Sequence, residues 1–403
     1  MKTLSISLML FVLTLTSQSC RDNMSGTDNA GNQWIYLGLA GKQIVRLKSS
    51  KSFVYACAAG DGLFRMPNSS LTPSWEYIGL SDTTLIAAID TTKGANLPVA
   101  ALSDIIINPE NENEMLVSIA SARPDIPGIY KSTDGGSIWA EADSGYGFVV
   151  DCQDSGTMKA AGVLFNPPRR PNTVFVGTIT DGYLFESSTF GRVWGMQPVI
   201  DAGIFSVTCI AADPSNPDVI YAGTDIRQHH CFYSFKILPP PLWFTTDGGI
   251  SWKYVHPPVP LSSPIPSYSG ISSVYVSGDS HEIYIGTGNE ILGSRDGGYT
   301  WTRLLTADDS TSIISSIVVD PSNENNMLAA DGTDLFKSDN AGNSWTKLPM
   351  PDGFGGAIAS LLWDGYSGNL YAATGFDLAG ATNANHGVYV LPNASMVLFG
   401  KSQ

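Results

Sequence analysis

The sequence predicts an all-β fold built from repeated four-stranded units, and three observations lead to this prediction. Gly and Pro together make up 65 of the 403 residues (41 and 24), which implies many turns and argues against a helical bundle. Hydrophobic residues reach 43%, so the chain can bury a large core. An eight-residue motif that ends in Trp also recurs along the chain, between short apolar runs.

The repeated motif, here called the octet, is read directly from the sequence. Its four clearest copies are STDGGSIW (132–139), TTDGGISW (245–252), SRDGGYTW (294–301) and SDNAGNSW (338–345). SSTFGRVW (187–194) and TDNAGNQW (27–34) are further copies, and RMPNSSLTPSW (65–75) fills the same slot without the motif. The pattern accounts for seven of the nine Trp residues, namely Trp34, Trp75, Trp139, Trp194, Trp252, Trp301 and Trp345.

The residues around the octets repeat as well. Apolar β-type runs come in pairs separated by Asx-Pro or Asx-rich turns, as in IAADPSNPDVIYAGT and IVVDPSNENNMLAAD. A third short run such as DLFKS leads into each octet, and a fourth begins at its Trp, as in WTRLL. Each repeat therefore predicts four short antiparallel strands, with Pro, Asn, Asp and Gly at the turns that need special backbone angles.

The pattern Ser/Thr-x-Asp-x-Gly-x-x-Trp resembles that of the Asp-box (BNR-repeat) β-propellers. That superfamily includes sialidases, xyloglucan-cleaving endoglucanases, sortilin-type receptors and photosystem II assembly factors. The resemblance implies a seven-bladed β-propeller over residues 34–393, followed by a C-terminal tail at 394–403. The first strands of the blades are expected to begin near Gln43, Asp104, Ala161, Ser206, Ser272, Ile313 and Ala359.

The last repeat lacks an octet, and the displaced N-terminal copy with WIYLGL supplies what is missing. We therefore expect the N-terminal strand to pair into the final blade, which closes the ring and removes the exposed sheet edges. The tail segment NASMVLFG is a competitor for the same edge.

The octet residues are interpreted as structural. Hydroxyl and carboxylate oxygens can accept backbone N–H bonds, Gly permits a positive φ, and Trp buries its ring. A motif that occurs once per blade points in many directions and cannot converge on one ligand. The residues assigned this role are Ser132, Asp134, Gly136, Trp139, Thr245, Asp247, Gly249, Trp252, Ser294, Asp296, Gly298, Trp301, Ser338, Asn340, Gly342 and Trp345.

The first twenty residues, MKTLSISLMLFVLTLTSQSC, are typical of a secretory signal peptide. A short apolar segment follows Lys2, and small residues precede Cys20. We expect residues 1–19 to be removed, Cys20 to be lipidated as in bacterial lipoproteins, and 20–33 to form a tether. The alternative is a plain secreted protein that begins with Cys. Either way the protein is exported, with the lipoprotein held at the cell envelope or surface.

The remaining four cysteines, an even number in an oxidising compartment, allow three pairings. Cys57 and Cys209 lie in strand-like runs and are interpreted as core residues. Cys152 and Cys231 lie in loop-like stretches and are the better candidates for a bridge, with four free or partly paired thiols as the alternative.

Long insertions all fall on one face of the predicted propeller. They are residues 83–96, 121–127, 143–159, 225–241, 256–269 and 376–386. Long loops on a rigid scaffold commonly carry binding or catalysis, so any site is expected on this face near the central channel. The candidate binding residues there are Tyr146, Arg227, His229, His230, Phe232, Tyr233 and His386.

Two functional hypotheses follow. The first is a surface-tethered binding or scaffold propeller that recognises a protein or glycan. The second is a glycoside hydrolase that uses two carboxylates on the same face, with Asp151, Asp181, Asp225 and Asp334 as candidates. We expect the first, because no enzyme motif of the superfamily is found. Phe64-Arg65-Met66-Pro67, for example, resembles a sialidase motif but occupies a third-strand slot.

Charge and composition limit the partners. The formal net charge of −15 without a basic cluster argues against nucleic acid, and against membrane contact other than through the lipid. The sequence Asp-x3-His-His-Cys at 225–231 has no known metal-ligand spacing, so no metal and no cofactor are expected. We expect a monomer.

Overall fold

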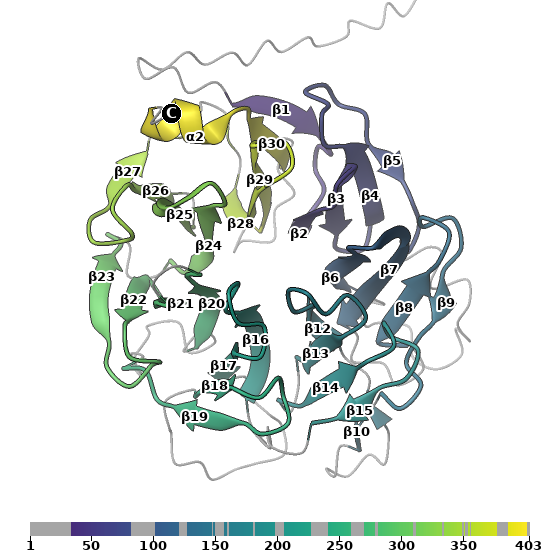
Figure 1. Cartoon of the computed structure of the whole chain (residues 1–403). Helices are drawn as coiled ribbons and strands as arrows, with labels where there is room; N and C mark the ends of the chain where they lie inside the picture. The colour runs from purple at the N-terminus through teal and green to yellow at the C-terminus, as the bar shows by residue number, and fades with distance from the viewer. Residues whose placement is uncertain are drawn as a thin grey trace, which may run out of the picture.

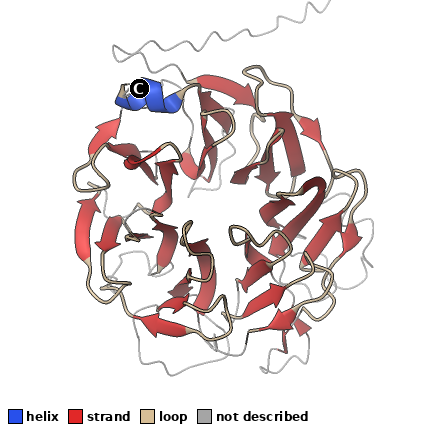
Figure 2. Cartoon of the chain, viewed as in Figure 1, coloured by secondary structure: helices blue, strands red, loops and turns tan. Residues whose placement is uncertain are grey.

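The computed structural model describes residues 34–81, 101–120, 127–146, 148–149, 157–158, 161–179, 182–197, 205–226, 241–258, 270–278, 281–308, 312–332, 334–348, 350, 354, 356–376 and 386–400. Seven four-stranded antiparallel sheets stand around a central channel like the blades of a propeller (Figures 1 and 2). This confirms the predicted fold class. Within these residues, no helix has the length and apolarity needed to cross a bilayer.

Blades 1 to 6 each take one repeat, with their strands in chain order from the channel to the rim, and blade 7 takes its outermost strand from the N-terminus (Figure 1). Blade 1 contains β2 (Ile44–Ser49), β3 (Phe53–Ala58), β4 (Gly62–Pro67) and β5 (Glu76–Tyr77). Blade 2 contains β6 (Ala101–Asn108), β7 (Asn111–Ala120), β8 (Ile129–Ser132) and β9 (Ala140–Glu141). Blade 3 contains β12 (Ala161–Phe165), β13 (Val174–Thr178), β14 (Leu184–Ser187) and β15 (Gly195–Met196).

The remaining blades follow the same order. Blade 4 contains β16 (Phe205–Ala212), β17 (Ile220–Ile226), β18 (Leu242–Thr245) and β19 (Lys253–Val255). Blade 5 contains β20 (Ile271–Val276), β21 (Ile283–Thr287), β22 (Glu290–Ser294) and β23 (Thr302–Thr306). Blade 6 contains β24 (Ile314–Asp320), β25 (Asn323–Asp331), β26 (Asp334–Ser338) and β27 (Thr346–Leu348). Blade 7 contains β28 (Ala357–Trp363), β29 (Leu370–Phe376), β30 (Gly387–Leu391) and, from the N-terminus, β1 (Ile35–Gly38). Strands β10 (Phe148–Val149) and β11 (Thr157–Met158) form a separate two-stranded antiparallel sheet, which lies between blades 2 and 3 in the sequence.

The ring closes as predicted, through the N-terminal strand. Strand β1 pairs antiparallel with β30, placing Ile35 opposite Val390 and Tyr36 opposite Tyr389. The alternative, in which the tail takes this edge, is not what the structure shows, because Ala394–Phe399 forms the short helix α2 instead of a strand. Two residues of α2, Ala394 and Leu398, are buried against the core between blades 6 and 7.

The core is divided among the interfaces between neighbouring blades. One cluster of buried hydrophobic residues fills each pair of adjacent blades, including the pair of blades 7 and 1. A glycine in the second strand permits the close approach: a Cβ on Gly286 of β21 would lie 2.7 Å from the Ile314 side chain of the next blade. Because each sheet face packs against a neighbour, no blade buries its apolar residues alone.

The octets form turns between the third and fourth strands. In the turn at 132–139, Ser132 Oγ accepts the Gly136 N–H at 2.8 Å and Asp134 Oδ1 accepts the Ile138 N–H at 2.9 Å. Gly135 and Gly136 both have positive φ values (73° and 90°), which glycine adopts without strain. The Ser and Asp side chains of the octet thus bond to their own turn.

Two departures from the motif keep the same geometry. In SSTFGRVW, Ser187 Oγ accepts the Gly191 N–H at 3.0 Å and Thr189 Oγ1 replaces the carboxylate as acceptor of the Val193 N–H at 3.2 Å. In SDNAGNSW, Asn340 Oδ1 accepts the Ser344 N–H at 2.9 Å. One acceptor oxygen at this position is therefore enough to form the turn.

Three octets have Asp at their third position, and from these carboxylates we expect a loss of stability in acid. Hydrogen bonds from Ser251 lower the pKa of Asp247 to about 2, bonds from Thr300 lower the pKa of Asp296, and the Ile138 N–H lowers that of Asp134. Because the pKa of each carboxyl group is lower in the folded state than the unfolded value near 3.8, the ionised group stabilises the fold at pH values above 3.8. This contribution is lost as the pH falls towards 2. We expect the urea midpoint of the native chain to fall between pH 4 and pH 2, and to fall less in the D134N/D247N/D296N variant. Equal losses in both proteins would contradict a role for these carboxylates.

Candidate functional site

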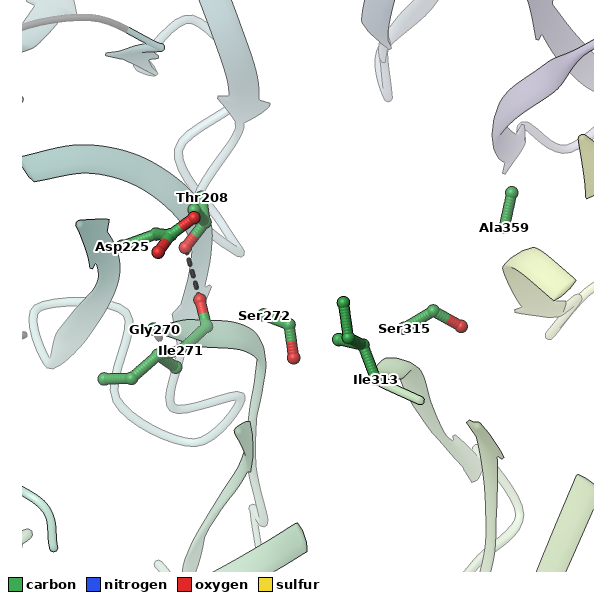
Figure 3. A pocket seen from close by; sticks show the side chains of 8 residues that line it. All are labelled: Thr208, Asp225, Gly270, Ile271, Ser272, Ile313, Ser315 and Ala359. Atoms are coloured by element: carbon green, nitrogen blue, oxygen red, sulfur yellow. Dashed lines mark hydrogen bonds between the residues drawn. The ribbon is translucent and has the colours of Figure 1, made fainter. Parts of the chain in front are cut away.

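The innermost strands begin, and the second strands end, on one face of the ring. We call it the loop-bearing face, because the predicted long insertions join the strands there. The opposite face carries the octets. At the channel opening on the loop-bearing face lies a cavity of about 320 Å³ (Figure 3). It is lined by Thr208, Asp225, Gly270, Ile271, Ser272, Ile313, Ser315 and Ala359. In Figure 3, Ala359 and Ser315 lie apart from Thr208 and Asp225, so the cavity reaches from blade 4 to blade 7.

A β-bulge at the start of every innermost strand builds this opening. The pairing with the second strand shifts between Ile44 and Arg46, Leu102 and Asp104, Ala161 and Leu164, Val207 and Cys209, Ile271 and Ser273, Ile314 and Ser316, and Ile358 and Ser360. A bulge leaves one residue out of the pairing and redirects its side chain. The bulged residues of blades 4, 5 and 6 are Thr208, Ser272 and Ser315, all of which line the opening.

Hydroxyls at the bulges connect successive blades. Thr208 Oγ1 donates to the carbonyl oxygen of Ile271 at 2.5 Å (Figure 3), Ser272 Oγ to that of Ile314 at 2.5 Å, and Ser315 Oγ to that of Ile358 at 2.6 Å. The residue after the bulge accepts a hydrogen bond from the next blade in return. Ser273 Oγ accepts the Ile317 N–H at 3.2 Å, and Ser316 Oγ accepts the Leu361 N–H at 3.4 Å. Ser360 Oγ accepts the Leu47 N–H at 3.1 Å. These bonds join each of the blades 4 to 7 to the blade that follows it, and blade 7 is joined in this way to blade 1.

These hydroxyl residues were not among the site residues predicted from the sequence. The sequence does contain a pattern that could have identified them: VTCIAA, ISSVYV, ISSIVV and IASLLW begin the innermost strands of blades 4 to 7. The pattern is easily overlooked, because small polar residues inside an apolar strand resemble ordinary alternation.

Below the opening, the channel contains a second cavity of about 330 Å³. It shares Thr208, Ser272 and Ser315 with the first cavity, so the two cavities adjoin. Charged side chains of blades 1 and 2 also line it: Arg46, Lys48 and Asp104.

The carboxylate of Asp104 is almost completely buried, with 1% of its side chain exposed. It accepts the N–H groups of Ile105 at 2.9 Å and Leu164 at 3.1 Å, which connects blade 2 to blade 3. Arg46 Nε lies 3.6 Å from Asp104 Oδ1, close enough for a charge interaction but too far for a hydrogen bond.

Of the four predicted catalytic carboxylates, only Asp225 lies in the opening among the described residues. Asp334 begins the third strand of blade 6 and forms an ion pair with Lys347 of the rim strand β27 at 2.6 Å, which raises the pKa of the lysine. Asp151 and Asp181 lie outside the described residues. The structure therefore does not bring Asp225 and Asp334 together.

Two of the predicted binding residues are described, and both side chains are buried. The ring of Tyr146 packs against Phe185 (centroids 4.8 Å apart) and Trp194 (6.2 Å), in the core between blades 2 and 3. Burial also raises the pKa of its hydroxyl. In this position Tyr146 anchors its segment to the core and presents no ring face to a ligand. The other residues, Arg227, His229, His230, Phe232 and Tyr233, lie outside the described residues.

His386 begins the third strand of blade 7, and its side chain is completely buried. Within the described part of the chain, neither ring nitrogen has a hydrogen-bond partner. The ring lies directly against Gly356, where an added Cβ would be 2.5 Å from Nε2. The packing leaves no room for a ligand on that side of the ring.

Cys57 and Cys209 are free thiols in the innermost half of their blades, and Cys57 is fully buried as the sequence indicated. Burial raises the pKa of Cys209 to about 12, so this thiol is neutral. Cys152 and Cys231, the candidates for a bridge, lie outside the described residues. Across the described ranges, no group of three His, Cys, Asp or Glu side chains is placed to hold a metal ion.

The opposite face has a larger hollow of about 630 Å³ over blades 1, 2 and 7. It is lined by the short turns 49–52 and 107–113 and by Tyr366. One of its polar side chains already connects two blades, because Glu112 Oε1 accepts the Ser52 N–H at 3.0 Å. Short turns line this hollow, whereas the long insertions are predicted on the loop-bearing face of the channel, so the channel is the better candidate site.

The comparisons with known proteins agree with the fold. No family model matches the sequence, and no curated protein matches it. Among solved structures, the chain is similar to the GH74 xyloglucanase from Xanthomonas campestris, with a TM-score of 0.62 and 14% identity over 90% of this chain and 54% of that one. It is similar to YCF48 bound to D1 peptide, with a TM-score of 0.58 and 12% identity over 91% of this chain and 96% of that one.

A third similar structure is the extracellular domain of BT4673 from B. thetaiotaomicron, with a TM-score of 0.55 and 12% identity over 90% of this chain and 40% of that one. The chain spans about half the length of the xyloglucanase. Identities this low show the fold alone, and the neighbours include an enzyme, a peptide-bound protein and an extracellular domain. The comparisons therefore place the chain among the β-propellers and leave its activity to be argued from its own residues.

Proposed function

We propose that the chain is an extracytoplasmic binding propeller, tethered through a lipid on Cys20, which recognises a protein or glycan through its loop-bearing face. The observation that carries this proposal is the pair of adjoining cavities at and below the channel opening, of about 320 and 330 Å³. Hollows of this size, with several converging polar groups on a rigid scaffold, are typical of binding sites. The extracellular domain among the structural neighbours supports an exported location.

The hydrolase alternative has the similarity to the xyloglucanase in its favour. Glycoside cleavage requires two carboxyl groups on opposite sides of one sugar. Within the described residues the opening contains a single carboxylate, that of Asp225, and Asp334 is engaged with Lys347 at the rim. Binding without cleavage therefore agrees better with these carboxylates.

A combined binding and hydrolysis assay tests the proposal. The purified chain is screened on glycan and peptide arrays, and each ligand found is then assayed for release of reducing sugar. We expect binding without hydrolysis, and about a tenfold loss of affinity in Asp225→Ala, because hydrogen bonds to a charged group contribute about 1.5–3 kcal/mol. Asp334→Ala is the matched control, with affinity expected within about twofold of the native chain.

Two results would contradict the proposal. Release of reducing sugar that is abolished by Asp225→Ala, or by alanine at Asp151, Asp181 or Asp334, would establish the hydrolase. Equal losses of binding in Asp225→Ala and Asp334→Ala would place the ligand elsewhere than the channel opening.

A further inference from the structure

Seven residues occupy equivalent positions at one level of the channel, each directly after the bulge of an innermost strand. From blade 1 to blade 7 they are Arg46, Asp104, Val163, Cys209, Ser273, Ser316 and Ser360. All seven line the second cavity. The polar members fall on consecutive blades, because blade 7 adjoins blade 1 in the closed ring.

The hydroxyl groups of the three serines at this level remain available as hydrogen-bond donors. Each Oγ of Ser273, Ser316 and Ser360 already accepts a backbone N–H from the next blade. None of the three donates a hydrogen bond to a described residue, whereas the bulge hydroxyls donate to carbonyl oxygens. A serine hydroxyl that only accepts retains one O–H donor for a ligand.

Arg46 continues this series in blade 1. An arginine cannot accept a hydrogen bond, so the contact that each serine makes with the next blade is absent here. Its Nε is buried and has no hydrogen-bond partner among the described residues, while 35% of the side chain remains exposed in the channel. The nearby carboxylate of Asp104 is already occupied by two backbone N–H groups.

The charges around this level favour an anion. Arg46 and Lys48 supply two positive charges and Asp104 one negative charge, and the Cys209 thiol is neutral. At this level, below the Asp225 carboxylate of the opening, the channel is thus positive by one charge, in a chain whose formal net charge is −15. A single carboxylate would balance this excess, and its two oxygens match the planar fork of a guanidinium.

We propose that this level of the channel binds a carboxylate group, held by the guanidinium of Arg46 and the hydroxyls of Ser316 and Ser360, with Lys48 adding positive charge. The carboxylate enters from the loop-bearing face past Thr208, Ser272 and Ser315, which line both cavities. The two volumes together accommodate a chain end or one sugar ring. This inference rests on the proposed function and specifies what the bound ligand carries: a peptide C-terminus or the carboxylate of an acidic sugar.

The test uses matched pairs of probes that differ only in the carboxylate. Triglycine and triglycine amide represent the peptide source, and glucuronate and glucose represent the sugar source, each titrated into the full chain by calorimetry or NMR. We expect at least one acid to bind at least tenfold more tightly than its neutral partner, with binding weakened by salt. The pair that shows the difference identifies the source.

Variants then locate the site. Arg46→Gln is expected to lower the affinity for the acid at least tenfold, and Ser316→Ala severalfold. Arg303→Gln is the control, since Arg303 lies on the rim strand β23 with 61% of its side chain exposed and should leave affinity unchanged. If Arg46→Gln does not fold, Arg46→Lys replaces it: the charge remains, but the fork is lost, and severalfold weaker binding is expected.

Three outcomes would overturn the inference. They are equal affinity for the acid and its neutral partner, no binding of either acid, and unchanged affinity in both the Arg46 and Ser316 variants. If the arrays still identify a ligand at the loop-bearing face, the proposed function stands and only the carboxylate site is wrong. If no array ligand binds either, the proposed function fails as well.

Discussion

Replacing Leu37 by alanine is expected to lower the free energy of unfolding by about 2–5 kcal/mol, the usual range for a large buried side chain. Leu37 lies in the N-terminal strand β1, is completely buried, and packs into the cluster between blades 7 and 1. Its carbonyl oxygen accepts a 2.9 Å bond from Trp75 Nε1 of blade 1. The side chain therefore stabilises the contact that closes the ring, and urea unfolding measures the loss.

The control for this prediction is Ile138→Ala. Ile138 is also a large aliphatic residue, but 71% of it is exposed on an octet turn, so a change within about 0.5 kcal/mol is expected. If Leu37→Ala were as mild as Ile138→Ala, the N-terminal strand would contribute little to stability. Closure of the ring would then depend on other contacts of the final blade.

The blades could be predicted from the sequence because the information is local. Each octet encodes a turn through Ser, Asp and Gly, and the apolar runs on either side have strand length and β-branched composition. The displaced octet at the N-terminus likewise indicated that β1 belongs to the last blade. The sequence does not decide the structure of the tail, because NASMVLFG is apolar enough for a strand, and only its burial against Trp34 and Trp363 shows where the helix lies.

The channel site could not be predicted in the same way. Arg46 lies in IVRLKS, where a basic residue in an amphipathic strand suggests a solvent-exposed side chain. Its equivalence to Ser360 and Asp104 depends on the bulges, and a bulge follows from the pairing of two strands, which no local pattern reveals. For Tyr146 the sequence instead indicated a binding residue that the structure does not support. An aromatic residue in an irregular stretch suggested a surface for a ligand, but the Tyr146 ring packs against Trp194 in the core.

Trp194→Ala is expected to have the largest effect of a single core substitution, about 3–5 kcal/mol of unfolding free energy. Trp194 ends the octet of blade 3, is 97% buried with 3% exposed, and packs against Tyr146. Its Nε1 donates to the Ala142 carbonyl oxygen of blade 2 at 2.7 Å. The substitution therefore leaves a cavity between two blades and a carbonyl group without its partner, and both effects destabilise.

Val193→Ala, one residue earlier, is the matched control, because Val193 is 54% exposed and should change stability by no more than about 0.5 kcal/mol. Urea unfolding of both variants, followed by tryptophan fluorescence and circular dichroism, measures the difference. The comparison also tests the structural interpretation of the octets, since Thr189 already replaces the usual Asp in this copy. A loss of unfolding free energy below about 1 kcal/mol in Trp194→Ala would show that the turn geometry shared by the octets, and not the buried indole, holds blade 3 against blade 2.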